Sequence, residues 1–537
     1  MAHVTLLVPF DPVMGASVGN NTMPPLRLAL LAGSTRAAGH ETEVIDGVGL
    51  GFERHWTWGD GFHLEGPSFE ELIERIPART QVLGLSMMFS QSYPPVRALL
   101  REIRRRRPEL VIVAGGEGMT GIADVAVREA ALDAVVVGEG EAPLLDVIDR
   151  VEAGRSLDGI ANVVTVRHPA AEAVNPREKG RFADADRIPA ADWRGIALTP
   201  YWEGNRVHGV NVDGRFLPMI ATRGCPYRCQ FCTAPGTWGG QRYLSHDVVI
   251  EQIERHRAEH DVEHFVFTDL SLTTSQRWFE GFVDRLDALT PRIRWSVPSG
   301  IRAERLSEDL LRRAKRSGLV YLQISPETGS ERVMSWIDKR MRVDSVLDTV
   351  RNAKSAGLTV AAAFVVGFPV ETWGDVVDTF RLTARLARTG LDEAVVSLFQ
   401  PLPGSPSFQE LREANQVTLT DAFYRSLFVA DVTMEASYNP AMSGYELRIV
   451  RLFFYLWLFL NVFASRPARL FASIGNAARG EQTHKLDRIL RRDFKRIVKN
   501  FLPVLTPTAL GVALKLIVHA RRQPQPHWAG AALATIR

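Results

Sequence analysis

The stretch Thr222-Arg-Gly-Cys-Pro-Tyr-Arg-Cys-Gln-Phe-Cys232 contains every cysteine of this 537-residue chain. Cys225, Cys229 and Cys232 have the spacing C-x3-C-x2-C, and the aromatic Phe231 directly precedes the last of them. Three thiolates can bind three irons of a [4Fe–4S] cluster and leave the fourth iron without a protein ligand. An open metal position can bind a small molecule and make it react. The stretch therefore predicts a cluster-binding loop.

Two other uses of three cysteines fit this chain less well. A disulfide framework needs an even number of cysteines and an oxidising compartment. Zinc usually takes four protein ligands, or three and a water molecule, and neither a fourth cysteine nor a suitably spaced histidine follows closely. Structural cysteines would be scattered along the chain rather than gathered in one loop. We therefore interpret Cys225, Cys229 and Cys232 as cluster ligands.

On these three cysteines and Phe231 the chain resembles the radical S-adenosylmethionine (SAM) superfamily. In that superfamily the unique iron chelates the amino and carboxylate groups of SAM, and one-electron reduction of the cluster releases a 5′-deoxyadenosyl radical. The resemblance implies a [4Fe–4S] cluster, SAM, and an external electron donor such as flavodoxin or ferredoxin.

Length and composition indicate a folded protein of about three domains. Hydrophobic residues make up 46% of the chain and charged residues 23%, which is typical of globular proteins. The formal net charge of +3 is small, so we expect no nucleic-acid partner. The scarcity of cysteine and the absence of a secretion-signal pattern predict a cytoplasmic location.

Residues 1–160 alternate between expected strands and helices. This order predicts a doubly wound, Rossmann-like α/β domain with ligand-binding loops at the carboxyl ends of its strands. Glycines after the last two strands would let a ligand approach the backbone, although ordinary turns explain them equally well. The expected strands are 4–10, 41–46, 80–88, 110–114 and 134–137, and the expected helices include 25–38 and 94–107.

A sheet of this kind directly before the cysteine loop resembles the cobalamin-binding domain of cobalamin-dependent radical SAM enzymes. Val-Ala-Gly-Gly-Glu-Gly-Met-Thr at 113–120 and Val-Val-Gly-Glu-Gly-Glu at 136–141 match its strand-end sequences. The resemblance implies that cobalamin is a cofactor and that its contacts come from the ends of three strands. These contacts are Ser86, Gly115, Gly116, Glu117, Gly138, Glu139 and Gly140.

The chain lacks the usual motif for the histidine that serves as the lower axial ligand of cobalt. Cobalamin modules commonly carry D-x-H-x-x-G after the first strand, whereas Asp60, His63 and Gly66 give D-x-x-H-x-x-G after the second. We interpret His63 as a surface-loop histidine. The resemblance therefore implies base-off cobalamin without a histidine ligand.

Residues 161–214 are interpreted as a linker, with 167–193 as an exposed connection. Residues 215–415 then contain six strand units, five of which lead into amphipathic helices such as 343–356. This pattern predicts a partial (β/α)6 barrel whose reactive residues lie at the carboxyl ends of its strands. The expected strands are 217–222, 264–268, 294–297, 320–325, 360–366 and 394–399.

The resemblance implies SAM-binding residues at these strand ends. Glu327 matches an acidic residue after the fourth strand, and Gly367 and Pro369 match a turn near the adenine. Asp269 and Arg302 match polar strand-end positions less closely. A helix cap or a surface ion pair would also explain such residues, and for Asp269 this alternative is equally good. Phe231 completes the implied SAM-binding set.

Residues 416–537 are expected to be mainly helical. Residues 449–464 are almost entirely apolar, but such a run of about sixteen residues is shorter than the ~20 that span a bilayer. A second apolar stretch covers 503–520, and basic residues lie between the two: Lys485, Arg488, Arg491, Arg492, Lys495, Arg496 and Lys499. The region is interpreted as a helical cap over the barrel mouth or as a peripheral membrane contact. Either interpretation favours a hydrophobic small-molecule substrate.

Together these features predict a cobalamin-dependent radical SAM C-methyltransferase that acts on an unactivated carbon of a hydrophobic or natural-product-type substrate. One alternative is a cobalamin-dependent cyclase or ring-rearranging enzyme. Another is a radical SAM oxidoreductase whose first domain is not catalytic. A methylthiotransferase is disfavoured, because no cysteines remain for a second cluster. The sequence singles out no acid–base catalytic residue.

Overall fold

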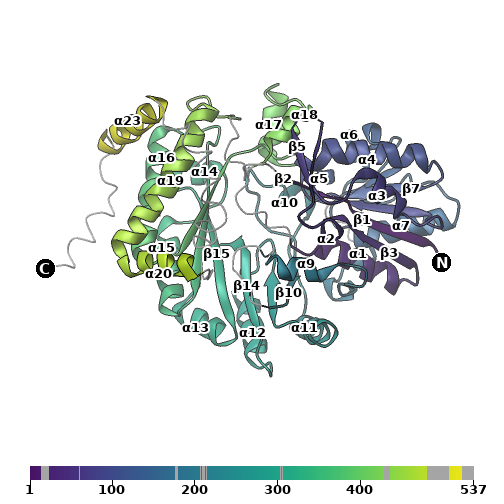
Figure 1. Ribbon diagram of the computed structural model, residues 1–537, viewed down its shortest axis with the longest axis horizontal. Helices are drawn as coiled ribbons and strands as arrows, with labels where there is room; N and C mark the ends of the chain where they lie inside the picture. Colours follow the sequence, from purple (N-terminus) through teal and green to yellow (C-terminus); the bar gives the residue numbers. More distant parts are fainter. Residues whose placement is uncertain are drawn as a thin grey trace.

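The computed structural model describes residues 1–13, 23–59, 61–175, 180–205, 207, 212, 214–302, 304, 306–428, 436–479 and 507–522. Two six-stranded sheets form the centres of two α/β units that lie side by side (Figure 1). The helices nearest the C-terminus pack on the side of the second unit that faces away from the first (Figure 1).

The first sheet has the strand order β3-β1-β6-β7-β8-β9. Its first five strands are parallel, and β9 pairs antiparallel with β8. The doubly wound sheet predicted from the sequence is confirmed, and β9 is an addition at its edge. The strands are β1 (His3–Val8), β3 (Glu41–Asp46), β6 (Val82–Ser86), β7 (Val111–Gly115), β8 (Ala134–Val136) and β9 (Val163–Val164).

Helices cover both faces of this sheet, so its strands are buried on both sides and appear in the sequence as continuous apolar runs. The strand order reverses between β1 and β6, which is where open α/β sheets bind ligands. The helices are α1 (Leu26–Ala37), α2 (Gly47–Leu50), α3 (Phe69–Glu74), α4 (Tyr93–Arg106), α5 (Glu117–Thr120), α6 (Ala123–Glu129) and α7 (Glu141–Glu152), with the 3-10 turn η1 (Ser90–Ser92).

A small antiparallel sheet, which the sequence analysis missed, lies beside the first. It has the order β2-β5-β4, from β2 (Asp11–Val13), β5 (Phe62–Glu65) and β4 (His55–Trp58). His63 therefore lies on a strand and not in a loop, but its side chain is exposed, with Nδ1 3.2 Å from Thr57 Oγ1. Asp60, the first residue of the motif, lies outside the described residues.

The second sheet confirms the predicted partial barrel. Its six strands are parallel and neighbour one another in chain order. They are β10 (Phe216–Met219), β13 (His264–Phe267), β14 (Arg294–Ile301), β15 (Leu319–Glu327), β16 (Thr359–Val366) and β17 (Glu393–Leu398). The helices that follow them are α11 (His246–His260), α12 (Gln276–Asp287), α13 (Glu308–Arg316), α14 (Glu331–Trp336), α15 (Val343–Ser355) and α16 (Trp373–Thr389).

The connection between the sheets is only partly exposed, contrary to the sequence-based expectation. It contains α8 (Ala170–Ala173), η2 (Gly180–Phe182), η3 (Ala185–Arg187) and α9 (Leu198–Glu203). Its end is buried: the Asp192 N–H donates to the Ala29 carbonyl at 2.8 Å, and the Asp192 carboxylate pairs with Arg36 at 2.9 Å. Trp193 is buried beside them. A run of alanine and proline has no periodicity that would reveal this packing.

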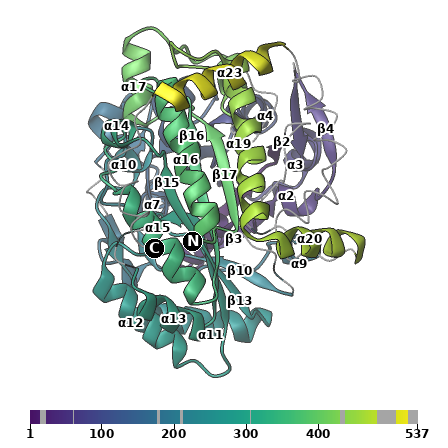
Figure 2. The same ribbon diagram turned by 90° about the vertical axis from the view of Figure 1, so that its left-hand side faces the viewer.

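Helices α19 (Gly444–Ser465), α20 (Pro467–Arg479) and α23 (Pro507–Arg522) lie along the outside of the barrel (Figure 2). Phe454 of α19 packs between Phe364 and Phe380, with ring centroids 5.1 and 5.7 Å away. The Tyr455 hydroxyl accepts the Val396 N–H of edge strand β17 at 3.2 Å. These described helices therefore cover the open edge of the barrel sheet. The start of α19 also reaches the barrel mouth, where Leu447 lies against the turn at Gly367. The basic residues between 485 and 499 lie outside the described residues.

Helix α19 is longer than the sequence analysis expected. It has 22 residues and is apolar enough to cross a membrane by length and composition, but 44% of its apolar window is buried within the protein. Packing against α16 and β17 accounts for the buried part of that composition, as in core helices, but not for the part that stays exposed.

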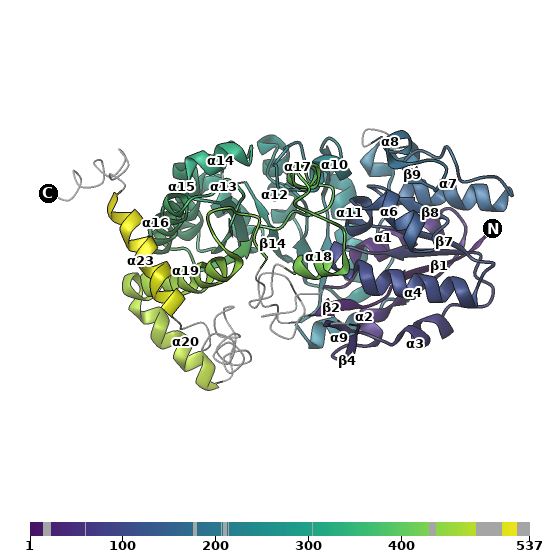
Figure 3. The ribbon, with the colours of Figure 1, turned by 90° about the horizontal axis from the view of Figure 1, so that it is seen from above.

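The segment after β17 bridges the barrel and the first unit. It contains α17 (Pro406–Glu413) and α18 (Asp421–Ser426), and α18 lies between the two units when the molecule is seen from above (Figure 3). Arg97 of α4 pairs with Asp421 at 2.9 Å, and the rings of Tyr93 and Tyr424 are 5.0 Å apart. These contacts hold the two sheets in a defined orientation.

Candidate active site between the two sheets

The cysteine loop is bounded by a short hairpin, β11 (Thr222–Arg223) with β12 (Arg242–Tyr243), and contains α10 (Ala234–Thr237). Gly224, directly before Cys225, has a φ of +79°, and a Cβ there would lie 2.6 Å from the Gly240 carbonyl oxygen. The Cys232 N–H donates to the Cys229 carbonyl at 3.1 Å. These local constraints fold the predicted ligands into one compact turn.

The three thiols suit a cluster better than a single metal ion. Among the described residues, two groups of side chains have three potential ligand atoms within 4.8 Å of one another. Neither group contains a cysteine, so the three thiol sulfurs do not all lie within that distance of one another. Three thiolates on one zinc ion would be only about 3.8 Å apart. Burial raises the pKa of all three thiols, that of Cys232 to about 12. Such thiols become thiolates when a metal supplies the compensating charge. The loop therefore fits a [4Fe–4S] cluster.

Two basic side chains flank this loop. Arg302 lies over the ring of Tyr227, 4.0 Å from its centroid, and forms a two-pronged pair with Glu304. Lys339 Nζ is 2.5 Å from Glu327 Oε1, and both side chains are buried. Burial dominates the raised pKa values of Cys225 and Cys229, but Lys339 and Arg302 both act to lower them.

Glu327, predicted as a SAM contact, is held in a strained conformation. It ends β15 at a register irregularity and has a φ of +62°, which non-glycine residues rarely adopt. Its partner Lys339 was missed by the sequence analysis, since a lysine twelve residues further along the chain gives no signal. Strain of this kind persists only where the surroundings enforce it, and it often marks functional sites.

The turn after β16 packs directly on the cysteine loop. The rings of Phe231 and Phe368 are 5.7 Å apart, and Pro369 follows as a half-buried residue. Gly367 has a φ of +87°, and its N–H donates to Glu371 Oε2. Burial raises the pKa of Glu371 to about 8. The turn thus places Phe368, between Gly367 and Pro369 in the chain, against Phe231.

Asp269 is buried, and one of its carboxylate oxygens bonds to the strand end while the other, Oδ2, has no hydrogen-bond partner among the described residues. Its Oδ1 accepts the N–H groups of Ala221 and Thr222 at 3.0 and 2.5 Å and the Thr222 hydroxyl at 2.7 Å. Burial raises the pKa of Asp269 to about 6. Neither a helix cap nor a surface ion pair describes it, because it fixes the strand end that leads into the cysteine loop.

Gln400 is a candidate site residue that the sequence analysis missed. It follows β17 at the carboxyl edge of the barrel and is only 4% exposed. Neither its Oε1 nor its Nε2 has a hydrogen-bond partner among the described residues. A buried amide without partners is costly, so Gln400 is suited to bind a ligand group at the barrel mouth.

The predicted cobalamin-contact residues cluster at the carboxyl edge of the first sheet. Ser86 and Gly115 end β6 and β7, and Gly116 and Gly138 have φ values of +97° and +78°. A Cβ on Gly138 would lie 2.7 Å from the Thr237 carbonyl oxygen of the barrel unit. Gly140 follows as the residue before α7.

An apolar surface accompanies these glycines. Met88 and Phe89, in the loop after β6, are each 46% exposed although they lie within a folded unit. A flat macrocycle needs such an apolar platform together with close backbone approach. The carboxyl edge of this sheet therefore fits cobalamin.

Three glutamates join the first unit to the barrel. Glu117 and Glu139 are predicted cobalamin contacts, and Glu141 lies near them in the chain. Glu117 accepts the Thr233 hydroxyl, and Glu139 pairs with Arg242. Glu141 pairs with Arg223 at 2.6 Å, and both side chains are almost completely buried. These bonds hold the carboxyl edges of the two sheets against each other. A pocket lies at this junction, lined in part by Val137, Gly138, Pro143, Asn162, Phe182 and Thr237.

Comparisons with known proteins agree with this geometry. Residues 219–383 match the Radical SAM superfamily, and residues 13–148 match the B12 binding domain. An uncharacterized methyltransferase of Pyrococcus horikoshii is 26% identical over 425 residues, covering 78% of this chain and 85% of that protein. The anaerobic magnesium-protoporphyrin IX monomethyl ester cyclase of Rubrivivax gelatinosus is 26% identical over 408 residues, which cover 75% of this chain and 69% of that protein.

The fold is also similar to that of a solved enzyme. The radical SAM methyltransferase TsrM from Kitasatospora setae, solved with cobalamin and a [4Fe–4S] cluster bound, has a TM-score of 0.61 and 18% identity, covering 77% of this chain and 78% of that one.

The fold and site define an enzyme that uses a radical SAM centre and a cobalamin-binding domain together. The chain belongs to the cobalamin-dependent radical SAM enzymes. Its cofactors are a [4Fe–4S] cluster, SAM and cobalamin.

Proposed function

We propose that this enzyme transfers a methyl group to an unactivated carbon of a hydrophobic small molecule. The observation that carries this proposal is the junction of the two sheets. There the glycine loops suited to cobalamin pack against the loop of three cysteines, through Gly138 with Thr237 and through Glu141 with Arg223. Methyl transfer to carbon needs both cofactors within reach of one substrate.

The protein's own task is to hold reactants in place. When bound, the cluster with SAM supplies a hydrogen-abstracting group, and cobalamin supplies the methyl group. Cys225, Cys229 and Cys232 would hold the cluster. Glu327 and Lys339 present opposite charges that match the amino and carboxylate ends of SAM.

The remaining predicted contacts have roles that follow from their positions. Phe231, Gly367 and Pro369 would border SAM, while Arg302 and Asp269 support the cysteine loop. Backbone contacts from the strand-end loops, together with Ser86, would hold cobalamin. These loop residues are Gly115, Gly116, Glu117, Gly138, Glu139 and Gly140.

A hydrophobic substrate is supported by an exposed apolar side chain at the end of a barrel strand, Leu270 after β13. Radical chemistry also benefits from a site that excludes water. We expect a cytoplasmic location and a small electron-transfer protein such as flavodoxin or ferredoxin as the electron donor.

A peripheral membrane contact belongs to the same proposal. The outer faces of α19, α20 and α23 expose an unusual number of large apolar residues, and such faces bind bilayer surfaces. They are Leu456, Trp457, Leu460, Leu470, Phe471, Leu510, Leu514, Ile517 and Val518.

A cyclase or ring-rearranging activity is the second candidate, because one relative is named a monomethyl ester cyclase. The test is an anaerobic reaction of reconstituted protein with SAM, a reductant, hydroxocobalamin and a panel of hydrophobic small molecules as substrates, followed by mass spectrometry and absorption spectroscopy. We expect bound cobalamin, 5′-deoxyadenosine, and a product heavier than the substrate by one CH2. A product without added CH2 would favour the cyclase, and 5′-deoxyadenosine without bound cobalamin would contradict both.

A further inference from the structure

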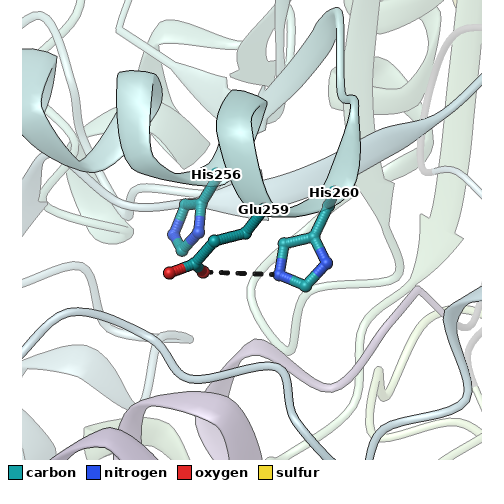
Figure 4. Close-up of side chains that lie close together, drawn as sticks. All are labelled: His256, Glu259 and His260. Carbon is teal, nitrogen blue, oxygen red and sulfur yellow. Dashed lines mark ion pairs between the residues drawn. The ribbon is translucent and has the colours of Figure 1, made fainter.

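Three potential metal ligands lie together on α11, well away from the cysteine loop. His256, Glu259 and His260 form the sequence H-x-x-E-H, and one ligand atom of each lies within 4.8 Å of the other two. Figure 4 shows the three side chains on one side of the helix, with the Glu259 carboxylate between the two imidazole rings. Histidines four residues apart on a helix face are a common arrangement for binding zinc.

The two histidines also have nitrogen atoms that lack partners. His256 is 1% exposed, and neither its Nδ1 nor the Nε2 of His260 has a hydrogen-bond partner among the described residues, although both atoms are buried. His260 Nε2 lies 3.7 Å from Glu259 Oε2, too far for a hydrogen bond. Buried ring nitrogens left unpaired are expensive, and a metal ion would satisfy both.

The charges around the group are mixed. Asp192 acts electrostatically on both histidines but is itself paired with Arg36 and Arg194. Glu259 keeps Oε2 free because Arg255 binds its other oxygen, Oε1, at 3.0 Å. Arg255 opposes a cation, but its bond to Oε1 fixes the carboxylate in place.

The position of the group indicates a structural metal. α11 ends at His260 and β13 begins at His264, so the group lies at the amino ends of the barrel strands. The cysteine loop follows the opposite end of β10. Residues at the amino face of a barrel serve stability and not catalysis. Trp193, from the end of the connection between the sheets, packs edge-on against His256 with ring centroids 6.4 Å apart.

We propose that His256, Glu259 and His260 bind a divalent transition metal, with zinc as the best match, and that this ion fixes α11 against the connection from the first unit. Zinc accepts two histidines and one carboxylate, with water in the remaining position on the exposed side of Glu259. Ligand atoms on one zinc ion are roughly 3.3 Å apart, so small side-chain rotations close this group onto the ion.

The test is equilibrium dialysis of the cluster-loaded protein against zinc chloride, with bound zinc counted by plasma mass spectrometry. We expect the wild type to bind one zinc more than His260→Gln, and Glu259→Gln to bind that zinc at least 10-fold more weakly. Zinc should also raise the melting temperature of the wild type and not that of His260→Gln. Both variants alter partly exposed side chains, so they should fold.

Two controls separate this site from others. Glu254→Gln changes an exposed residue of the same helix and should keep the zinc. Replacing Cys225, Cys229 and Cys232 by alanine together should also keep it. Equal zinc uptake by the wild type and His260→Gln would overturn the proposal, as would zinc that disappears with the cysteines.

Discussion

The charge of Lys339 is expected to influence the cluster directly, because this lysine is buried beside Glu327 and acts on Cys225 and Cys229. Lys339→Met removes a positive charge near the cluster, which disfavours the more negative, reduced state. We expect the midpoint potential to fall by tens of millivolts, on the order of 1 kcal/mol. Potentiometry followed by electron paramagnetic resonance measures this. Lys339→Arg keeps the charge and is the control; an unchanged potential in Lys339→Met would refute the effect.

Glu371 should make the stability of the protein depend on pH. Burial raises its pKa to about 8 in the folded state from an ordinary value of 4.5, so folded Glu371 holds a proton that unfolded Glu371 has lost. Stability therefore falls as pH rises from about 4.5 to about 8, and it levels off above that. Glu371→Gln resembles the protonated form and should lose this dependence.

Thermal unfolding of both proteins at pH 5, 6, 7 and 8 measures the difference. We expect the free energy of unfolding of the wild type to fall relative to that of Glu371→Gln across this range. The fall should be a few kcal/mol at most, which is the order of the free energy that this pKa shift corresponds to. Other groups, such as Asp269, titrate in both proteins and cancel in the comparison. Parallel pH profiles would mean that Glu371 is ionised in the folded protein.

At the scale of elements, the strands of both sheets except β9 could be predicted, and the contacts between the sheets could not. Buried parallel strands leave continuous apolar runs, so β3 and β16 lie within a residue of their expected positions. The bonds of Glu117 with Thr233 and of Glu141 with Arg223 join residues 116 and 82 positions apart. No local pattern reveals such pairs. Lys339 was missed for the same reason, and Gln400 was missed because a single buried amide leaves no sequence pattern.

The turn at Gly138 offers a test at this scale. Gly138→Ala places a methyl group 2.7 Å from the Thr237 carbonyl oxygen in a backbone conformation with φ +78°. Gly154→Ala is the matched control, since it has φ +61° and no atom within 4 Å of the added Cβ. The control should cost about 1 kcal/mol from backbone strain alone. Gly138→Ala should lower the free energy of unfolding by more than the control does. It should also retain less bound cobalamin than the control after gel filtration. Equal losses would show that the contact with Thr237 is unimportant.

At the scale of the whole molecule, the buried pair of Arg223 and Glu141 should couple the two cofactor units. Both residues are about 5% exposed. Removing Arg223 leaves Glu141 buried without its cation, and removing Glu141 leaves Arg223 only Glu139, which is 3.9 Å away and also paired with Arg242. Arg223→Met or Glu141→Gln alone should cost about 3–5 kcal/mol of stability, and the double variant should recover much of it. The exposed pair of Arg312 and Glu308 is the control, and its removal should cost less than about 1 kcal/mol.

The functional consequence of breaking this pair separates coupling from simple folding. The cysteine loop and the glycine loops lie in different units, so a loosened junction should leave SAM cleavage largely intact while methyl transfer falls. The measurement is the ratio of methylated product to 5′-deoxyadenosine in the double variant, which keeps no unpaired charge. We expect this ratio to drop several-fold relative to the wild type. An unchanged ratio, with both products reduced equally, would mean that the pair contributes to stability alone and that the units are aligned by other contacts, such as Arg97 with Asp421.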